Sequence, residues 1–322
     1  MRRLLLLFTI CISSQLTYSQ GFLKKLGENK VVSDVLEGKP AISTGFKDVD
    51  LKNTMPPDFG ANETYTSLST LTKNAEGKYE LNTGFYETTN LSYCLKAGTN
   101  GPAKGDSYGN APIKGKMDDI VEAILIKSQE LWRNKATGST TNKLTSSFIT
   151  QKDVQLLLWA IIAKADFDDM QNKTKSVALA LLSPEQILKL NGGAVKSVVN
   201  FASDKGWMEK PALVRSIEEA EQSLRQLYKS SNSTYEDFER LAVLAGVNTE
   251  AQPAPFGTWF KHKDGFYIRY EPHGYPRTHI KIYVPEKKKV ELGITGVIAT
   301  PSDSRQRLAQ TDMSVEEYEK LK

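Results

Sequence analysis

Two of the 322 residues are cysteines, and only Cys94 lies outside the first nineteen residues. If those first residues are removed, a single thiol remains, which excludes an internal disulfide and any metal site built from paired cysteines. The thiol of Cys94 could be a small buried apolar group, a catalytic nucleophile, or one half of a covalent bond to something other than sulfur. The choice depends on the elements that position it.

The residues around Cys94 predict a fixed position near the end of a strand. Apolar and polar side chains alternate over residues 64–95, and residues 75–77 (AEG) offer a turn between two strands. Residues 96–116 then contain five glycines and two prolines, which predicts a long loop rather than more strand.

The spacing of apolar residues changes twice after residue 116. Nearly every stretch of residues 117–246 has helical spacing, and residues 153–167 (DVQLLLWAIIAKADF) are apolar on almost every side after Gln155, which predicts a helix in the protein interior. Residues 257–301 return to a two-residue alternation typical of an antiparallel meander. We therefore expect an α+β fold, with β-rich N- and C-terminal parts flanking a helical middle.

The same patterns predict the domain limits. Residues 20–61 have few apolar repeats and indicate a loosely ordered lead-in, and residues 62–300 should form a single α+β domain. Residues 301–322 indicate a polar C-terminal tail with a frayed or partner-dependent structure.

Two short stretches resemble motifs of bacterial thioester domains, which are found at the tips of surface adhesins. Tyr93-Cys94-Leu95 is similar to an aromatic-Cys-aliphatic motif, and residues 154–159 (VQLLLW) are similar to a Gln followed by an apolar run and Trp. The resemblance implies that Cys94 is the acyl acceptor and Gln155 the acyl donor of an internal thioester, formed with loss of ammonia. A thioester survives only where water is excluded, and Trp159 with the leucines before it can supply an apolar shield. Gln151 is a rival donor four residues earlier, although it lacks the matching Trp.

The resemblance implies an exported binding or adhesion-type protein that captures a partner covalently, and interaction is favoured over turnover. One alternative is a structural or interaction protein of the cell envelope without special chemistry, in which Cys94 and Gln155 are ordinary residues. A second alternative is a cysteine peptidase acting on cell-wall peptide, with Cys94 as nucleophile and His279, on the polar face of a predicted strand, as base. The partner is then an unknown protein or an envelope or surface ligand.

Residues 1–19 predict a secretory signal peptide. Arg2 and Arg3 precede an apolar run at residues 4–12, and small polar residues end the segment. The apolar run is far shorter than the roughly 20 residues that cross a bilayer. We therefore expect an exported mature chain without a membrane span, located in the periplasm, on the cell surface or outside the cell.

Charge and acidic motifs limit the partners further. The full chain has 42 basic and 38 acidic residues and a formal charge of +4; without Arg2 and Arg3 the balance is 40 to 38, or +2. This balance gives no electrostatic reason to expect nucleic acid as a partner. Asp166, Asp168 and Asp169 lack the spacing of a calcium-binding loop, so no metal site is predicted, and the sequence indicates no cofactor.

Overall fold

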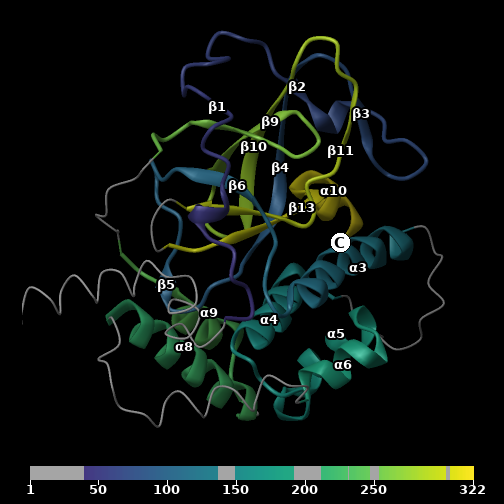
Figure 1. Ribbon diagram of the computed structural model, residues 1–322. Coiled ribbons are helices and arrows are strands. Elements are labelled where there is room, and N and C mark those ends of the chain that lie inside the picture. The colour runs from purple at the N-terminus through teal and green to yellow at the C-terminus, as the bar shows by residue number, and fades with distance from the viewer. Residues whose placement is uncertain (1–39, 137–148, 192–211, 231, 247–253, 302–304) are drawn as a thin grey trace, which may run out of the picture. The chain divides into compact units, whose positions relative to one another are not determined.

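The computed structural model describes residues 40–136, 149–191, 212–230, 232–246, 254–301 and 305–322. Residues 41–193 and 215–322 form one compact unit, and the account below concerns the described part of that unit (Figure 1). The predicted signal peptide and residues 20–39 of the predicted lead-in lie outside the described residues.

Nine of the described strands form one curled sheet. Along the sheet the order is β1 (Thr54–Met55), β8 (Trp259–Lys261), β9 (Tyr267–Pro272), β10 (Arg277–Val284), β4 (Gly84–Cys94), β13 (Leu308–Ser314), β12 (Val297–Pro301) and β6 (Tyr108–Pro112), and β2 (Thr66–Ser67) pairs parallel to β4. The Tyr270 hydroxyl on β9 donates a hydrogen bond of 2.6 Å to Asn110 Oδ1 on β6. Strands from the two halves of the sheet therefore meet, and the sheet encloses its own core.

The alternation of side chains explains that core. On β10, Thr278, Ile280, Ile282 and Val284 are buried, while the residues between them face outward and are more exposed. Successive side chains of a strand point to opposite faces, so every second residue fills the inside of the curl. The aliphatic residues of β10 pack there with Phe266 and other residues of neighbouring strands.

Two small sheets accompany the main one. Strand β11 (Val290–Leu292) pairs with β3 (Tyr79–Leu81), and β5 (Thr99–Asn100) pairs in parallel with β7 (Val243–Leu244). The second pair ties the loop after Cys94 to the helical part of the chain.

The helices gather on one side of the curled sheet (Figure 1). They are α3 (Asp118–Ala136), α4 (Gln151–Ile162), α5 (Asn172–Leu181), α6 (Pro184–Leu190), α8 (Ala212–Lys229), α9 (Tyr235–Ala242) and α10 (Val315–Leu321), with 3-10 turns η1 (Phe46–Asp48), η2 (Leu68–Thr70) and η3 (Phe167–Asp169). In α4, nine of the twelve residues are buried, as expected for a helix that is apolar on almost every side. The predicted α+β class, with β-rich parts flanking a helical middle, is confirmed.

The described residues correct both predicted domain limits. Residues 41 and 42 are buried and β1 belongs to the main sheet, so the core begins well before residue 62. The predicted polar tail is wrong for residues 305–322, because β13 lies between β4 and β12, and Tyr318 of α10 packs its ring 4.8 Å from that of Trp132. The polar side chains of β13 misled the prediction: Gln310 and Thr311 are buried and hydrogen-bond to the main chain instead of facing water.

Within the described ranges, no helix has both the length and the apolar character that crossing a bilayer requires.

Candidate functional site around Cys94

Cys94 is the last residue of β4 and is completely buried. It lies opposite Leu308 of β13, and the next residue, Leu95, donates a backbone hydrogen bond of 2.8 Å to the Arg307 carbonyl. The strand end therefore has a fixed position, as the sequence predicted, and β13 supplies the neighbouring wall.

Gln155 lies directly beside Cys94, but its carboxamide faces the backbone of that residue. Gln155 Oε1 accepts a hydrogen bond of 2.9 Å from the Cys94 amide, and Nε2 donates one of 3.0 Å to the Cys94 carbonyl. A capping box between Thr150 and Asp153 fixes the start of α4 and so the place of Gln155 within its first turns. Gln155 acts as a side-chain partner for the otherwise unpaired edge of the strand end.

The sulfur of Cys94 contacts a different glutamine. Its thiol donates a short hydrogen bond to Gln306 Oε1, and the sulfur is 3.2 Å from the Lys96 carbonyl oxygen. Gln306 is also completely buried, and its Nε2 donates two hydrogen bonds of 2.9 Å, to the carbonyls of Thr99 and Ala242. The structure therefore places a carboxamide, with every polar atom engaged, against the thiol.

Sequence reasoning did not find Gln306. It lies in a polar stretch, residues 302–307 (SDSRQR), that indicated exposure. One signal was present: two apolar residues, Leu308 and Ala309, follow directly after it, and both are buried.

The surroundings keep the thiol protonated. Burial raises the pKa of Cys94 to about 12, against smaller opposing effects from the nearby Trp159 side chain and the Lys96 backbone. A thiol with this pKa is not the activated thiolate of a conventional cysteine nucleophile. The site is dry and holds its sulfur in the neutral form.

An aromatic cluster covers the helix side of the site. The buried Trp159 ring lies one turn after Gln155 on α4, with the rings of Tyr235 and Tyr275 at centroid distances of 5.5 and 6.1 Å. The two tyrosine hydroxyls are 2.6 Å apart, and that of Tyr275 also donates to Glu239. Trp159, Tyr235 and Tyr275 are called the aromatic cover below.

Gln151, the rival acyl donor, faces away from the sulfur. Its Nε2 donates to the carbonyl of Pro276 at 2.8 Å and to that of Ser92 at 3.3 Å. It fastens the β9–β10 turn to β4, next to the aromatic cover.

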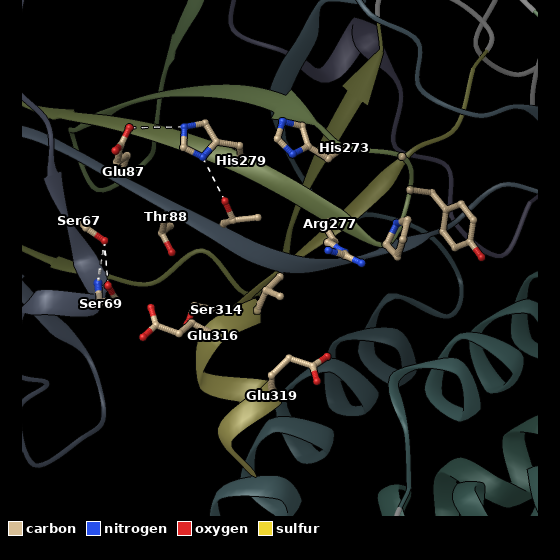
Figure 2. Close-up of a pocket in the computed structure, with 15 residues that line it drawn as sticks. Ser67, Ser69, Glu87, Thr88, His273, Arg277, His279, Ser314, Glu316 and Glu319 are labelled. Carbon is tan, nitrogen blue, oxygen red and sulfur yellow. Dashed lines mark hydrogen bonds and ion pairs between the residues drawn. The ribbon is translucent and has the colours of Figure 1, made fainter. Parts of the chain in front are cut away.

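His279 is not brought to Cys94. Its Nδ1 is 3.1 Å from Thr89 Oγ1, and its Nε2 is 3.5 Å from a Glu87 carboxylate oxygen (Figure 2). Thr89 is opposite His279 in the sheet and precedes Cys94 by five residues, roughly 17 Å of strand at about 3.4 Å per residue. Burial lowers the pKa of the His279 imidazole, against the opposing charges of Glu271 and Glu87.

His279 instead lines an open polar cleft of about 700 Å³ (Figure 2). Glu87, His273, Arg277 and Glu316 lie around the same cleft, together with several hydroxyl side chains. Tyr275 also borders it, so the aromatic cover separates this cleft from the buried sulfur. Among the described residues, no group of three or more His, Cys, Asp or Glu side chains could hold a metal ion.

Comparison of the chain with protein-family models, curated proteins and solved structures gives no match. The chemistry of the site is therefore argued from its own geometry.

Proposed function

We propose that Cys94 forms an internal acyl thioester with a glutamine carboxamide and that this bond captures an amine-bearing partner covalently. The observation that carries the proposal is the contact between the Cys94 thiol and the Gln306 carboxamide inside a site without exposed surface. A thioester needs such a dry setting, because water would otherwise hydrolyse it.

The hydrogen bonds of Gln306 suit the formation step. The sulfur attacks Cδ of Gln306, the thiol proton passes to Nε2, and ammonia leaves, so that a C–S bond replaces the C–N bond. The carbonyls of Thr99 and Ala242 accept both hydrogens of Nε2 and hold the leaving nitrogen in a defined position. Reacting groups held at contact distance gain much of their rate from this positioning alone.

Gln306 is the acyl donor that the geometry favours over Gln155. For Gln155 to reach the sulfur, it would have to give up two buried hydrogen bonds to the Cys94 backbone, leaving both backbone groups unpaired. Gln306 already lies against the thiol. In this proposal Gln155 holds the strand end in place, and Trp159 keeps water from the bond.

Capture of a partner follows the formation step in reverse, with an amine of the partner in place of ammonia. A nitrogen nucleophile attacks the acyl carbon, the Cys94 thiol is released, and an amide bond joins the partner to residue 306. Once ammonia has left, the carbonyls of Thr99 and Ala242 each lose the N–H donor that Nε2 supplied, and the Ala242 carbonyl keeps the Gly98 amide at 3.0 Å. The vacated positions favour an incoming amine over a nucleophile without N–H groups. The partner would be a protein or an envelope or surface ligand, met outside the cytoplasm if residues 1–19 direct export.

Intact mass tests the proposal. The purified chain should be about 17 Da lighter than its sequence requires, and methylamine should add to it and expose one alkylatable thiol. Peptide mapping should find Cys94 and Gln306 in one cross-linked peptide. The Gln306→Ala and Cys94→Ala variants should show full sequence mass, whereas Gln155→Ala should retain some mass deficit if it folds. A wild-type chain of full mass with a freely alkylated Cys94 would reject the thioester, and a Cys94–Gln155 cross-linked peptide would return the donor role to Gln155.

A further inference from the structure

The carboxylate of Glu239 is hydrogen-bonded to the aromatic cover. Glu239 accepts the hydroxyl proton of Tyr275, and Tyr275 is in turn 2.6 Å from the hydroxyl of Tyr235. Burial, followed by the hydrogen bond to Glu239, raises the pKa of Tyr275, so this phenol stays protonated and remains the donor.

The same helix reaches the acyl donor. Glu239 precedes Ala242 by three residues on α9, and the Ala242 carbonyl accepts a hydrogen bond from Gln306 Nε2. The C-terminal end of α9 therefore lies at the leaving nitrogen, and Glu239 lies within one turn of that end. Beside burial, the negative charge of Glu239 makes a small further contribution that raises the pKa of Cys94.

An incoming amine needs a proton acceptor in this place. At neutral pH an alkylamine is almost entirely ammonium, which has no lone pair for attack. The dry site offers no water to take the proton. A carboxylate beside the aromatic cover both attracts the cation and can remove its proton.

We propose that Glu239 is the general base that prepares an amine for attack on the thioester and that the Tyr275 hydroxyl orients its carboxylate. This inference rests on the proposed thioester. In the first step Glu239 takes one proton from the ammonium and becomes a carboxylic acid. The free amine then attacks the acyl carbon, the C–S bond breaks, the second nitrogen proton passes to the Cys94 sulfur, and Glu239 returns its proton to solvent.

Two nucleophiles separate this role from a structural one. Methylamine is almost entirely ammonium at neutral pH, whereas hydroxylamine is almost entirely neutral and needs no base before it attacks. In the Glu239→Gln variant, which keeps an acceptor for Tyr275, methylamine addition should slow by about 100-fold, the lower end of what a positioned general base contributes. Hydroxylamine addition should change by less than about 3-fold.

The matched control is Glu236→Gln, on the same helix but exposed and paired with Lys152 at 3.3 Å. It should react with both nucleophiles at the wild-type rate. Tyr275→Phe should slow methylamine less than Glu239→Gln does, because the base remains but is less well oriented.

The outcomes are distinct. A wild-type chain without the mass deficit overturns the thioester itself and the base with it. A Glu239→Gln chain that has the deficit and reacts with methylamine at the wild-type rate overturns only the base. The base is also overturned if both nucleophiles slow equally, or if Glu239→Gln lacks the deficit, because the carboxylate would then act in packing or in thioester formation.

Discussion

Two regions at different points along β4 show that reactive potential and the number of titratable groups are separate properties. The cleft around His279 is open and polar and is bordered by two histidines, an arginine and several glutamates (Figure 2). The Cys94 site has one thiol between two carboxamides, and its central residues have almost no exposed surface. The cleft resembles a conventional active site more closely, yet the His279 imidazole already contacts Thr89 and Glu87.

The difference lies in what water can reach. Charges in an open cleft are solvated and screened, so their mutual effects are small. In the Cys94 site water is excluded, and burial is the largest of the effects that raise the pKa of the thiol to about 12. A dry site can preserve an acyl bond that would hydrolyse in the cleft.

The strongest test of that comparison is to open the dry site. Trp159→Ala removes a fully buried indole and should lower the free energy of unfolding by about 3–5 kcal/mol, as large-to-small core substitutions do. If a thioester is present, water should also enter and hydrolyse it, which leaves a chain about 1 Da heavier than its sequence requires. Urea unfolding and intact mass measure the two effects.

Arg277→Ala is the matched change in the cleft. Its side chain is exposed, so the free energy of unfolding should stay within about 0.5 kcal/mol of the wild type and the mass should not change. Equal losses in the two variants would contradict the division of the molecule into a dry site and a solvated cleft.

The second test concerns what holds the strand end. Gln155→Ala leaves the amide and carbonyl of Cys94 without their side-chain partner, and buried unpaired groups cost about 1–3 kcal/mol each. We expect a loss of about 2–4 kcal/mol in the free energy of unfolding, measured by urea titration.

Gln151→Ala, one turn earlier on α4, is the control. The Pro276 carbonyl that Gln151 reaches keeps its hydrogen bond from the Ser92 amide, so the loss should be about 1 kcal/mol. A larger loss for Gln151→Ala than for Gln155→Ala would show that the β9–β10 turn, not the Cys94 backbone, is the critical attachment.

Much of this arrangement followed from sequence patterns. The apolar run after Gln155 predicted the interior helix α4, and the alternation before Cys94 predicted the strand β4. The spacing of apolar residues indicates which faces of an element are buried, and in both elements this spacing favours one type of secondary structure. The short motifs also named two residues, Cys94 and Gln155, that the structure brings into contact.

The sequence pattern did not predict which atoms of these residues contact each other. Whether the Gln155 carboxamide meets the sulfur or the backbone of Cys94 depends on hydrogen bonds between distant segments, which residue spacing does not encode. Gln306 was missed for a related reason, because a polar residue is expected at the surface unless its partners are known. Its partners are main-chain carbonyls of Thr99 and Ala242, far away in the chain.

The smallest expected effect comes from the cleft and tests the peptidase alternative. His279→Gln should leave any mass deficit and methylamine addition unchanged, and should alter the free energy of unfolding at pH 7 by less than about 0.5 kcal/mol. A peptidase that used His279 as its base would lose its activity in the same variant. Loss of cleavage of a cell-wall peptide, or of methylamine addition, would therefore contradict the assignment of the chemistry to the buried site.

The pH dependence of the same variant follows from the direction of the His279 pKa. Burial lowers that pKa in the folded chain, so on acidification the unfolded chain binds the proton first, and the contribution of His279 to stability is lost as pH falls below the ordinary histidine value. Wild type should therefore lose slightly more stability than His279→Gln between pH 7 and pH 5, by less than about 1 kcal/mol, because the side chain is 22% exposed. Urea titrations at the two pH values measure the difference. A larger loss of stability in the variant would mean that Glu87 and Glu271, rather than burial, have the larger effect on the pKa of the imidazole. The cleft would then be less solvated than its open shape indicates.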